Sequence, residues 1–167
     1  MGRVPTVIVD TNLANGYGRI EAMNKIEAWH AEGRVDVFNA SRVWRETSGN
    51  VWRRMKGIGR KYLVEPGVVG PTSIVGDMVV ASRHTPDFEE LRAMLFPSVS
   101  MEKLLDNPNQ TNDTMILLTA IEHRIGFLLT EDGNFHRCAA VALERYNVRI
   151  MRAAAFAALL EREAQDG

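Results

Sequence analysis

The stretch from Thr111 to Phe135 constrains the fold more than any other part of the chain. Apolar residues recur at helical spacing from Thr114 to His123, and residues 127–130 then form a short apolar run typical of a strand. A helix of about 12 residues spans roughly 18 Å. A strand of about five residues returns roughly 17 Å. We therefore expect Asp113, which begins the helix, and Asp132, which follows the strand, at the same edge of a sheet.

Short apolar strands and amphipathic helices alternate along the rest of the chain. We expect strands at residues 4–9, 35–38 and 148–151, and helices at 20–31, 135–146 and 153–163, with another helix starting at Ser41. This alternation favours an α/β fold with a mostly parallel sheet. No domain boundary is evident, so residues 1–167 are predicted to form a single domain. Residues 62–110 are its least typical part and a candidate insertion, with a strand expected at 78–81 and a helix beginning near Thr85.

The composition narrows the class of protein. The 167 residues carry a net charge of −1, which gives no reason to expect non-specific binding of nucleic acid by the whole molecule. Cys138 is the only cysteine, which rules out an internal disulfide and fits a reducing compartment. No apolar run approaches the ~20 residues that a membrane span needs. We therefore expect a cytoplasmic protein without a membrane segment.

Four acidic residues from distant parts of the chain are predicted to meet at one edge of the sheet. Asp10 ends the first strand, and Glu46 lies near the second turn of the helix that follows the second strand. Asp113 starts a helix, and Asp132 follows a strand. Because ligands bind at the carboxyl ends of the strands in parallel α/β sheets, this edge is the candidate functional site.

The chemistry of these acids favours a metal ion. We expect no basic residue to be equally well placed among them. Like charges a few ångströms apart do not all stay ionised unless a cation is present. Ligand sets made only of oxygen select hard ions, so Mg²⁺ or Mn²⁺ is expected rather than zinc. Such an ion, held by few carboxylates, keeps positions open for water and for a phosphate substrate.

Four motifs follow one another along the chain: Val7 to Asn12, Glu46 early in a helix, Asn112-Asp113, and Leu129 to Phe135. In this order they resemble the PIN-domain nucleases, and most closely the toxin ribonucleases of VapC type. The resemblance covers most of the chain. It implies a three-layer α/β/α sandwich, a Mg²⁺ or Mn²⁺ site, and endonucleolytic cleavage of RNA by an activated water. It also implies a homodimer and, for a toxin, an antitoxin protein as partner.

The resemblance also assigns roles to individual residues. The catalytic and metal-binding acids are then Asp10, Glu46, Asp113 and Asp132. The supporting polar residues are Asn12, Thr130, Asn112 and Asn134. Many members of the family carry a further acid where this chain has Asn134, which weakens the case for a second tightly held metal.

A basic run lies between residues 41 and 61, where seven Lys and Arg residues accompany a single acid, Glu46. One interpretation is a rim that binds RNA phosphates beside the acidic centre. The candidate RNA-binding residues are Arg42, Arg45, Arg53 and Arg54. The other interpretation is a solvated helix face, which is the usual position of interspersed charges.

Each acid also has an ordinary structural explanation. Asp10 suits a turn after a strand, and Asp113 and Asp132 suit the amino-terminal end of a helix, where a carboxylate accepts hydrogen bonds from free amides. Glu46 can pair with an arginine on its own helix. Two other functions therefore stay open. One is a non-catalytic PIN-like module that binds RNA or a protein, and the other is a phosphotransfer enzyme with Asp10 as its nucleophile.

Overall fold

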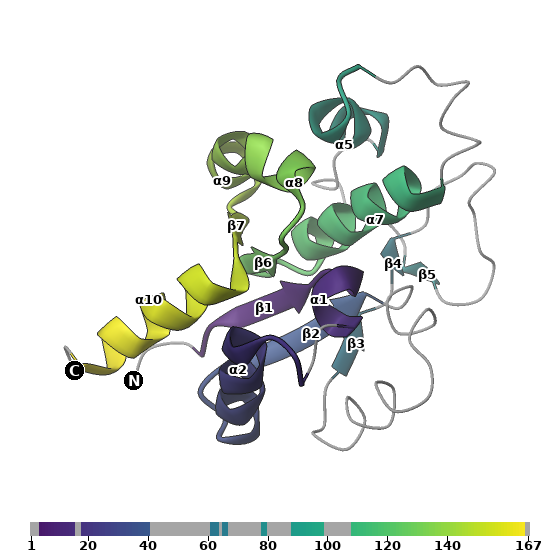
Figure 1. The fold of residues 1–167 in the computed structure, drawn as a ribbon. Coiled ribbons are helices and arrows are strands. Elements are labelled where there is room, and N and C mark those ends of the chain that lie inside the picture. Colours follow the sequence, from purple (N-terminus) through teal and green to yellow (C-terminus); the bar gives the residue numbers. More distant parts are fainter. Residues whose placement is uncertain are drawn as a thin grey trace.

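Five short strands pair in parallel to form the main sheet, in the order β3-β2-β1-β6-β7 (Figure 1). The computed structural model of the protein describes residues 4–15, 18–40, 61–63, 65–66, 78–79, 88–98 and 108–165. The strands are β1 (Thr6–Val9), β2 (Asp36–Ala40), β3 (Lys61–Leu63), β6 (Phe127–Leu129) and β7 (Arg149–Met151). β1 lies in the middle of the sheet, and its residues Val7, Ile8 and Val9 are fully buried. Such a run of apolar residues is typical of a parallel strand that is covered on both faces.

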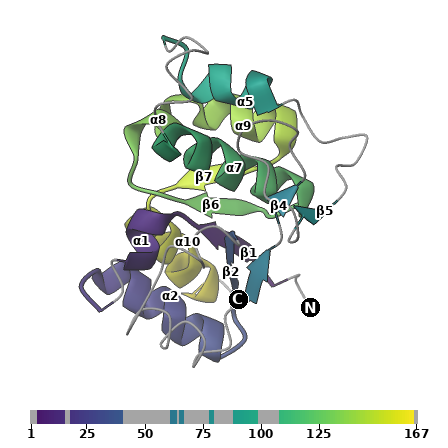
Figure 2. The ribbon, with the colours of Figure 1, turned by 90° about the vertical axis from the view of Figure 1, so that its right-hand side faces the viewer.

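Helices cover both faces of this sheet, which gives three α/β/α layers. The helices are α1 (Thr11–Asn15), α2 (Glu21–Ala31), α5 (Phe88–Leu95), α7 (Pro108–Glu122), α8 (Gly133–Arg137), α9 (Ala139–Tyr146) and α10 (Ala153–Gln165). Figure 2 shows α2 and α10 on one side of the sheet and α5, α7 and α9 on the other. α2 contacts α10, and α5 contacts α7. The predicted α/β fold with a mostly parallel sheet is confirmed.

The register of the sheet brings together residues that are far apart in the chain. β1 pairs with β6 from Val7 and Phe127 up to Val9 and Leu129. The amide of Asp10 donates to the carbonyl of Leu129 at 3.0 Å, which extends the pairing by one residue. Asp10 and the residue after Leu129 therefore lie side by side at the carboxyl edge of the sheet.

α7 begins earlier than predicted, and this changes the position of one candidate acid. We expected Asp113 to start the helix, but α7 begins at Pro108, so Asp113 lies in its second turn. Proline suits the first turn of a helix because its φ is preset and no partner is needed for an amide there. The polar residues that follow are then held by packing: Thr111 is 4% exposed, and the hydroxyl of the buried Thr114 donates to the carbonyl of Gln110 at 2.8 Å.

α1 is a second difference, because this single turn was not predicted. The carbonyl of Asp10 accepts a hydrogen bond from the amide of Ala14 at 2.9 Å, and both Leu13 and Ala14 are buried. The turn starts directly after β1, so it sets the position of Asp10 at the edge of the sheet.

Residues 62–110 are described only in part. β4 (Glu65–Pro66) and β5 (Met78–Val79) form a separate pair of parallel strands, and α5 follows them. The predicted strand at 78–81 is thus found at its first two residues. That these residues are an insertion stays a prediction, and the helix expected from Ser41 lies outside the described residues. Within the described ranges, no helix has both the length and the apolar character needed to cross a membrane.

Candidate active site

Asp10 is a nearly buried carboxylate at the end of the central strand. Its residue is 3% exposed, and its Oδ2 accepts a hydrogen bond from the hydroxyl of Thr130 at 2.8 Å. The backbone amides of Thr11 and Asn12, at the start of α1, also bond to this carboxylate. Asp10 therefore caps the turn after β1, which is the structural role that the sequence analysis considered for it. The same contacts fix its carboxylate at the edge of the sheet.

Thr130 links Asp10 to the second acid of the site. Its side chain is fully buried, and its Oγ1 accepts a hydrogen bond from the amide of Asp132 at 3.0 Å while donating to Asp10. On the other side, Nε2 of His136 lies 2.9 Å from the carbonyl of Thr130. Since a carbonyl only accepts, the ring donates through Nε2. These contacts join β1, β6 and α8 around one threonine.

Asp132 is the N-cap of α8. Its backbone is extended, with φ −73° and ψ 129°, and its Oδ1 accepts from the amide of Asn134 at 2.6 Å. The capping role that the sequence suggested for this residue is therefore present. Among the described residues, no hydrogen bond is made to its Oδ2. One oxygen of the carboxylate thus stays available at the edge of the sheet.

The charge of Asp132 acts on the carboxyl group of Asp10. Burial raises the pKa of Asp10 above the ordinary value of 3.8, the bonds from Thr130 and the backbone amides lower it, and the charge of Asp132 raises it again. Burial is the largest of these effects. A pair of acids with this electrostatic coupling favours a nearby cation, because a positive charge stabilises both ionised forms.

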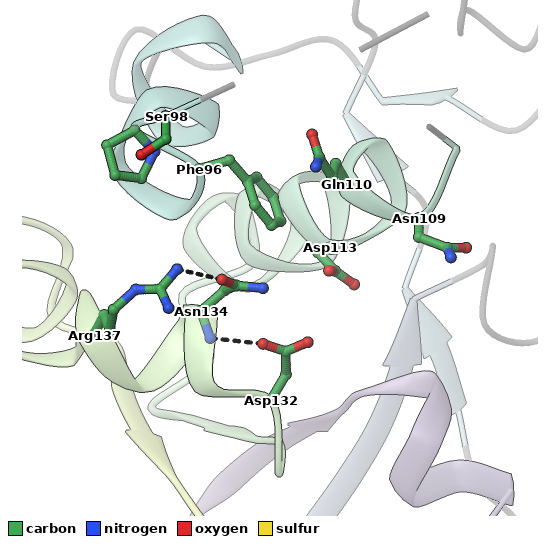
Figure 3. A pocket seen from close by; sticks show the side chains of 9 residues that line it. Phe96, Ser98, Asn109, Gln110, Asp113, Asp132, Asn134 and Arg137 are labelled. Carbon is green, nitrogen blue, oxygen red and sulfur yellow. Dashed lines mark hydrogen bonds between the residues drawn. The ribbon is translucent and has the colours of Figure 1, made fainter. Parts of the chain in front are cut away.

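A pocket of about 590 Å³ lies beside these acids, between the end of α5, the first turns of α7 and the start of α8 (Figure 3). The side chains of Asp113 and Asp132 both face it. The residues that line it are Phe96, Pro97, Ser98, Asn109, Gln110, Asp113, Asp132, Asn134 and Arg137. Its wall is therefore polar on the α7 and α8 sides and partly apolar on the α5 side.

Arg137 is a basic residue in this pocket, although we expected none to be as well placed as the acids. Its guanidinium lines the same pocket as Asp113 and Asp132, and it donates a hydrogen bond to Oδ1 of Asn134 (Figure 3). Arg137 lies three residues after Asn134, which is the spacing of neighbours on one helix face. That spacing was a signal available in the sequence. Phe96 and Gln110 were also missed, and their approach depends on how α5 packs on α7, which the sequence does not reveal.

The structure brings only some of the predicted site residues together. Asp10, Thr130 and Asp132 form one connected group, and Asp113 and Asn134 face the adjoining pocket. The side chain of Asn12 is exposed on α1, and Asn112 lies on α7 without lining the pocket. The remaining candidates lie outside the described residues: Glu46, Arg42, Arg45, Arg53 and Arg54.

The donors at this edge suit a hard metal ion better than zinc, since they are all oxygens. Within the described ranges, however, no three Asp, Glu, His or Cys side chains are close enough together to hold one ion. This does not match a site in which all the described acids bind at once. Mg²⁺ is commonly bound by only one or two carboxylates, with water and substrate phosphate as further ligands. Two carboxylates at this edge fit that requirement, and the role of Glu46 stays a prediction.

Comparison with known proteins adds no assignment. No model of a protein family matches the chain, and no curated protein matches it. The resemblance to the PIN-domain nucleases therefore rests on the motif residues themselves.

Proposed function

We propose that the protein is a metal-dependent endoribonuclease that cleaves phosphodiester bonds of RNA with water as the nucleophile. One observation carries the proposal. Thr130 ties Asp10, at the end of β1, to Asp132, just after β6, and Asp113 faces the pocket that adjoins them. Acids from three parts of the chain are thus concentrated at the edge of the sheet where α/β proteins bind ligands.

The residues of the site would have different roles in metal binding and positioning. Asp132 and one neighbouring acid, Asp10 or Asp113, would hold the ion. When bound, a divalent ion supplies a more acidic water and neutralises charge that develops on the phosphate and the leaving oxygen. Thr130 donates a hydrogen bond to the carboxylate of Asp10 and so favours one orientation of it. Because Asp10 is buried and already bonded, it is poorly placed to attack a substrate, which counts against the phosphotransfer alternative.

The experiment is cleavage of a labelled single-stranded RNA with Mg²⁺ or Mn²⁺, repeated with chelator. We expect Asp10→Asn and Asp132→Asn to reduce cleavage by at least about a hundredfold, as the loss of a few kcal/mol of transition-state stabilisation implies. Asp36→Asn is the matched control, because Asp36 begins β2, at the opposite edge of the sheet. Equal cleavage by all of these proteins would contradict the assignment of the cleavage to these acids.

A non-catalytic RNA-binding module is the second candidate. It is favoured by Asn134, where many PIN-domain nucleases carry an acid, and by the lack of three clustered donors in the described part of the chain. The two functions differ in metal binding. Since a ligand that binds only the folded state stabilises it, the nuclease should show a higher melting temperature in millimolar Mn²⁺. A module should bind RNA without this shift and without cleavage.

A further inference from the structure

Arg137 is held in the pocket by an amide and not by a carboxylate. Its guanidinium donates to Oδ1 of Asn134, whose own backbone amide donates to Asp132 (Figure 3). Although Asp113 and Asp132 line the same pocket, no ion pair joins Arg137 to an acid within the described ranges. The positive charge of Arg137 is therefore oriented by its contact but not neutralised by it.

Arg137 contacts an amide and not a carboxylate because residue 134 is an asparagine. An asparagine offers a neutral oxygen that fixes the direction of the guanidinium and leaves its other N–H groups for a ligand. A carboxylate at the same position would form an ion pair with Arg137, because the two residues are neighbours on one helix face. Within the described residues, the pocket therefore holds a guanidinium without an ion pair, and two carboxylates line the same pocket.

A ligand complementary to both the guanidinium of Arg137 and the carboxylates is an anion that also binds a metal ion. Phosphodiesters have this property, and the planar fork of a guanidinium matches two phosphate oxygens. We propose that Arg137 binds a phosphodiester group of the substrate, and that Asn134 is the residue that positions Arg137 for this contact. The proposal deepens the proposed function and rests on it for the identity of the substrate, but it is tested by binding and not by cleavage.

The test measures the affinity of a labelled single-stranded RNA of about ten nucleotides by fluorescence anisotropy, over a series of KCl concentrations. Ca²⁺ replaces Mg²⁺ as a hard cation for the acids, and a gel confirms that the probe stays intact. Single-stranded DNA of the same sequence is the second probe. If the contact is to phosphate alone, substitutions of Arg137 should weaken binding of both probes by the same factor, whereas an effect on RNA alone would overturn a phosphate contact.

Two arginine variants give the main comparison. Arg137→Ala should weaken binding about tenfold, since charge-assisted hydrogen bonds to phosphate are lost. The slope of log Kd against log salt should also fall by about 0.7, the value for one phosphate contact on a single strand. Arg162→Ala removes the same charge from α10, on the other side of the sheet, and should change neither quantity. Equal effects of the two substitutions, or no effect of Arg137→Ala, would overturn the proposal.

Two further variants separate binding from a structural role. Arg137→Lys keeps the charge but not the fork, so the salt slope should stay normal while part of the affinity is lost. Asn134→Ala removes the tether and keeps Arg137, so it should weaken binding less than Arg137→Ala and leave the slope unchanged. If Asn134→Ala binds like the wild type, the positioning role is wrong. Since the side chain of Arg137 is exposed and that of Asn134 is partly exposed, both variants should unfold close to the urea concentration of the wild type.

The outcomes for the two proposals are distinct. If RNA binding depends on Arg137 but no cleavage occurs in Mn²⁺, the nuclease function is contradicted and the phosphate contact of Arg137 is supported. Cleavage in Mn²⁺ with no dependence of binding or salt slope on Arg137 would keep the nuclease and contradict the phosphate site.

Discussion

The hydroxyl of Thr130 serves two acidic residues at once, since it donates to the carboxylate of Asp10 and accepts from the amide of Asp132. Thr130→Val keeps the shape of the side chain and removes both bonds. Because a buried carboxylate then loses one of its hydrogen-bond donors and the amide of Asp132 loses its acceptor, we expect the free energy of unfolding to fall by about 1–3 kcal/mol. Urea denaturation measures this.

Thr119→Val is the control for that substitution. Thr119 is equally buried, but its hydroxyl donates to the carbonyl of Met115 within α7, a bond that competes with the helix backbone and adds little. Its loss should cost less than the loss of the Thr130 hydroxyl. If the two variants are destabilised by the same amount, the carboxylate of Asp10 does not depend on Thr130.

The raised pKa of Asp10 predicts how stability changes with pH. A carboxyl group whose pKa is higher in the folded protein than in the unfolded chain binds protons more tightly when folded. Its favourable contribution is therefore complete below the ordinary value of 3.8 and is lost as pH rises through the raised pKa. Asp10→Asn does not titrate. We expect the variant to gain stability relative to the wild type as pH rises above the ordinary value of 3.8, until it passes the raised pKa of Asp10.

Urea denaturation of both proteins at several pH values, without metal, gives this difference directly. A constant difference over the whole range would mean that the pKa of Asp10 is not raised by folding. Adding Mn²⁺ should reduce the pH dependence if an ion binds beside Asp10, because a cation favours the ionised carboxylate.

Part of this residue-level picture could be predicted from the sequence. Asp10 and Asp132 follow apolar strands, and parallel strands bring their carboxyl ends together, so their proximity follows from the pattern. The contacts of Phe96 in the pocket could not be predicted in the same way. They depend on the packing of α5 and α8 around the pocket, and apolar periodicity carries no information on which helices become neighbours.

At the scale of elements, the start of α8 allows the capping role of Asp132 to be distinguished from its proposed role in cleavage. Asp132 caps this helix through its Oδ1, and its charge is also required by the proposed function. Serine caps a helix about as well as aspartate but has no charge. Asp132→Ser should therefore retain the stability of the wild type within a few tenths of a kcal/mol, whereas Asp132→Ala should lose about 1 kcal/mol. Urea denaturation distinguishes the two variants.

Both variants should lose RNA cleavage, because neither has the carboxylate. Cleavage by Asp132→Ser at the wild-type rate would mean that Asp132 only ends a loop and starts a helix. If the two variants lost cleavage only in proportion to their loss of stability, unfolding would explain the lower activity, and the carboxylate of Asp132 would have no part in the cleavage.

The start of α7 is a boundary that helix propensity predicts wrongly. Apart from Gln110, the residues from Asn109 to Asp113 are poor helix formers, and we expected the helix to begin only at Asp113. The helix nevertheless includes them, because Pro108 suits its first turn and the buried side chains of Thr111 and Thr114 pack inside the protein. Asp113 still faces the pocket, but from the second turn.

At the scale of the whole molecule, the order of strands and helices was largely predictable from apolar runs. The centre of the sheet has the clearest signal, because β1 is covered on both faces and is apolar at every position from Val7 to Val9. In the pair formed by β4 and β5, the sequence indicated a strand at 78–81, where β5 lies, whereas β4, with only two residues, was not predicted. Strands this short are defined by their neighbours and not by their own sequence.

The resemblance to toxin ribonucleases leads to a prediction for the intact protein in cells. If it cleaves cellular RNA, induced expression should arrest growth, and Asp113→Ala should relieve the arrest. Alanine is the best helix former, so the substitution should not disturb α7. Colony counts and growth curves after induction give the result, and immunoblots must show equal amounts of both proteins, since a destabilised variant is degraded in cells.

Asp36→Asn tests whether the arrest depends on the site. Asp36 lies at the start of β2 and should leave the arrest unchanged, because it is at the edge of the sheet away from the pocket. If Asp113→Ala accumulates to the wild-type level and still arrests growth, the arrest has another cause than cleavage at this site. If Asp113→Ala relieves it and Asp36→Asn does not, the harmful activity belongs to the pocket that Asp113 shares with Asp132 and Arg137.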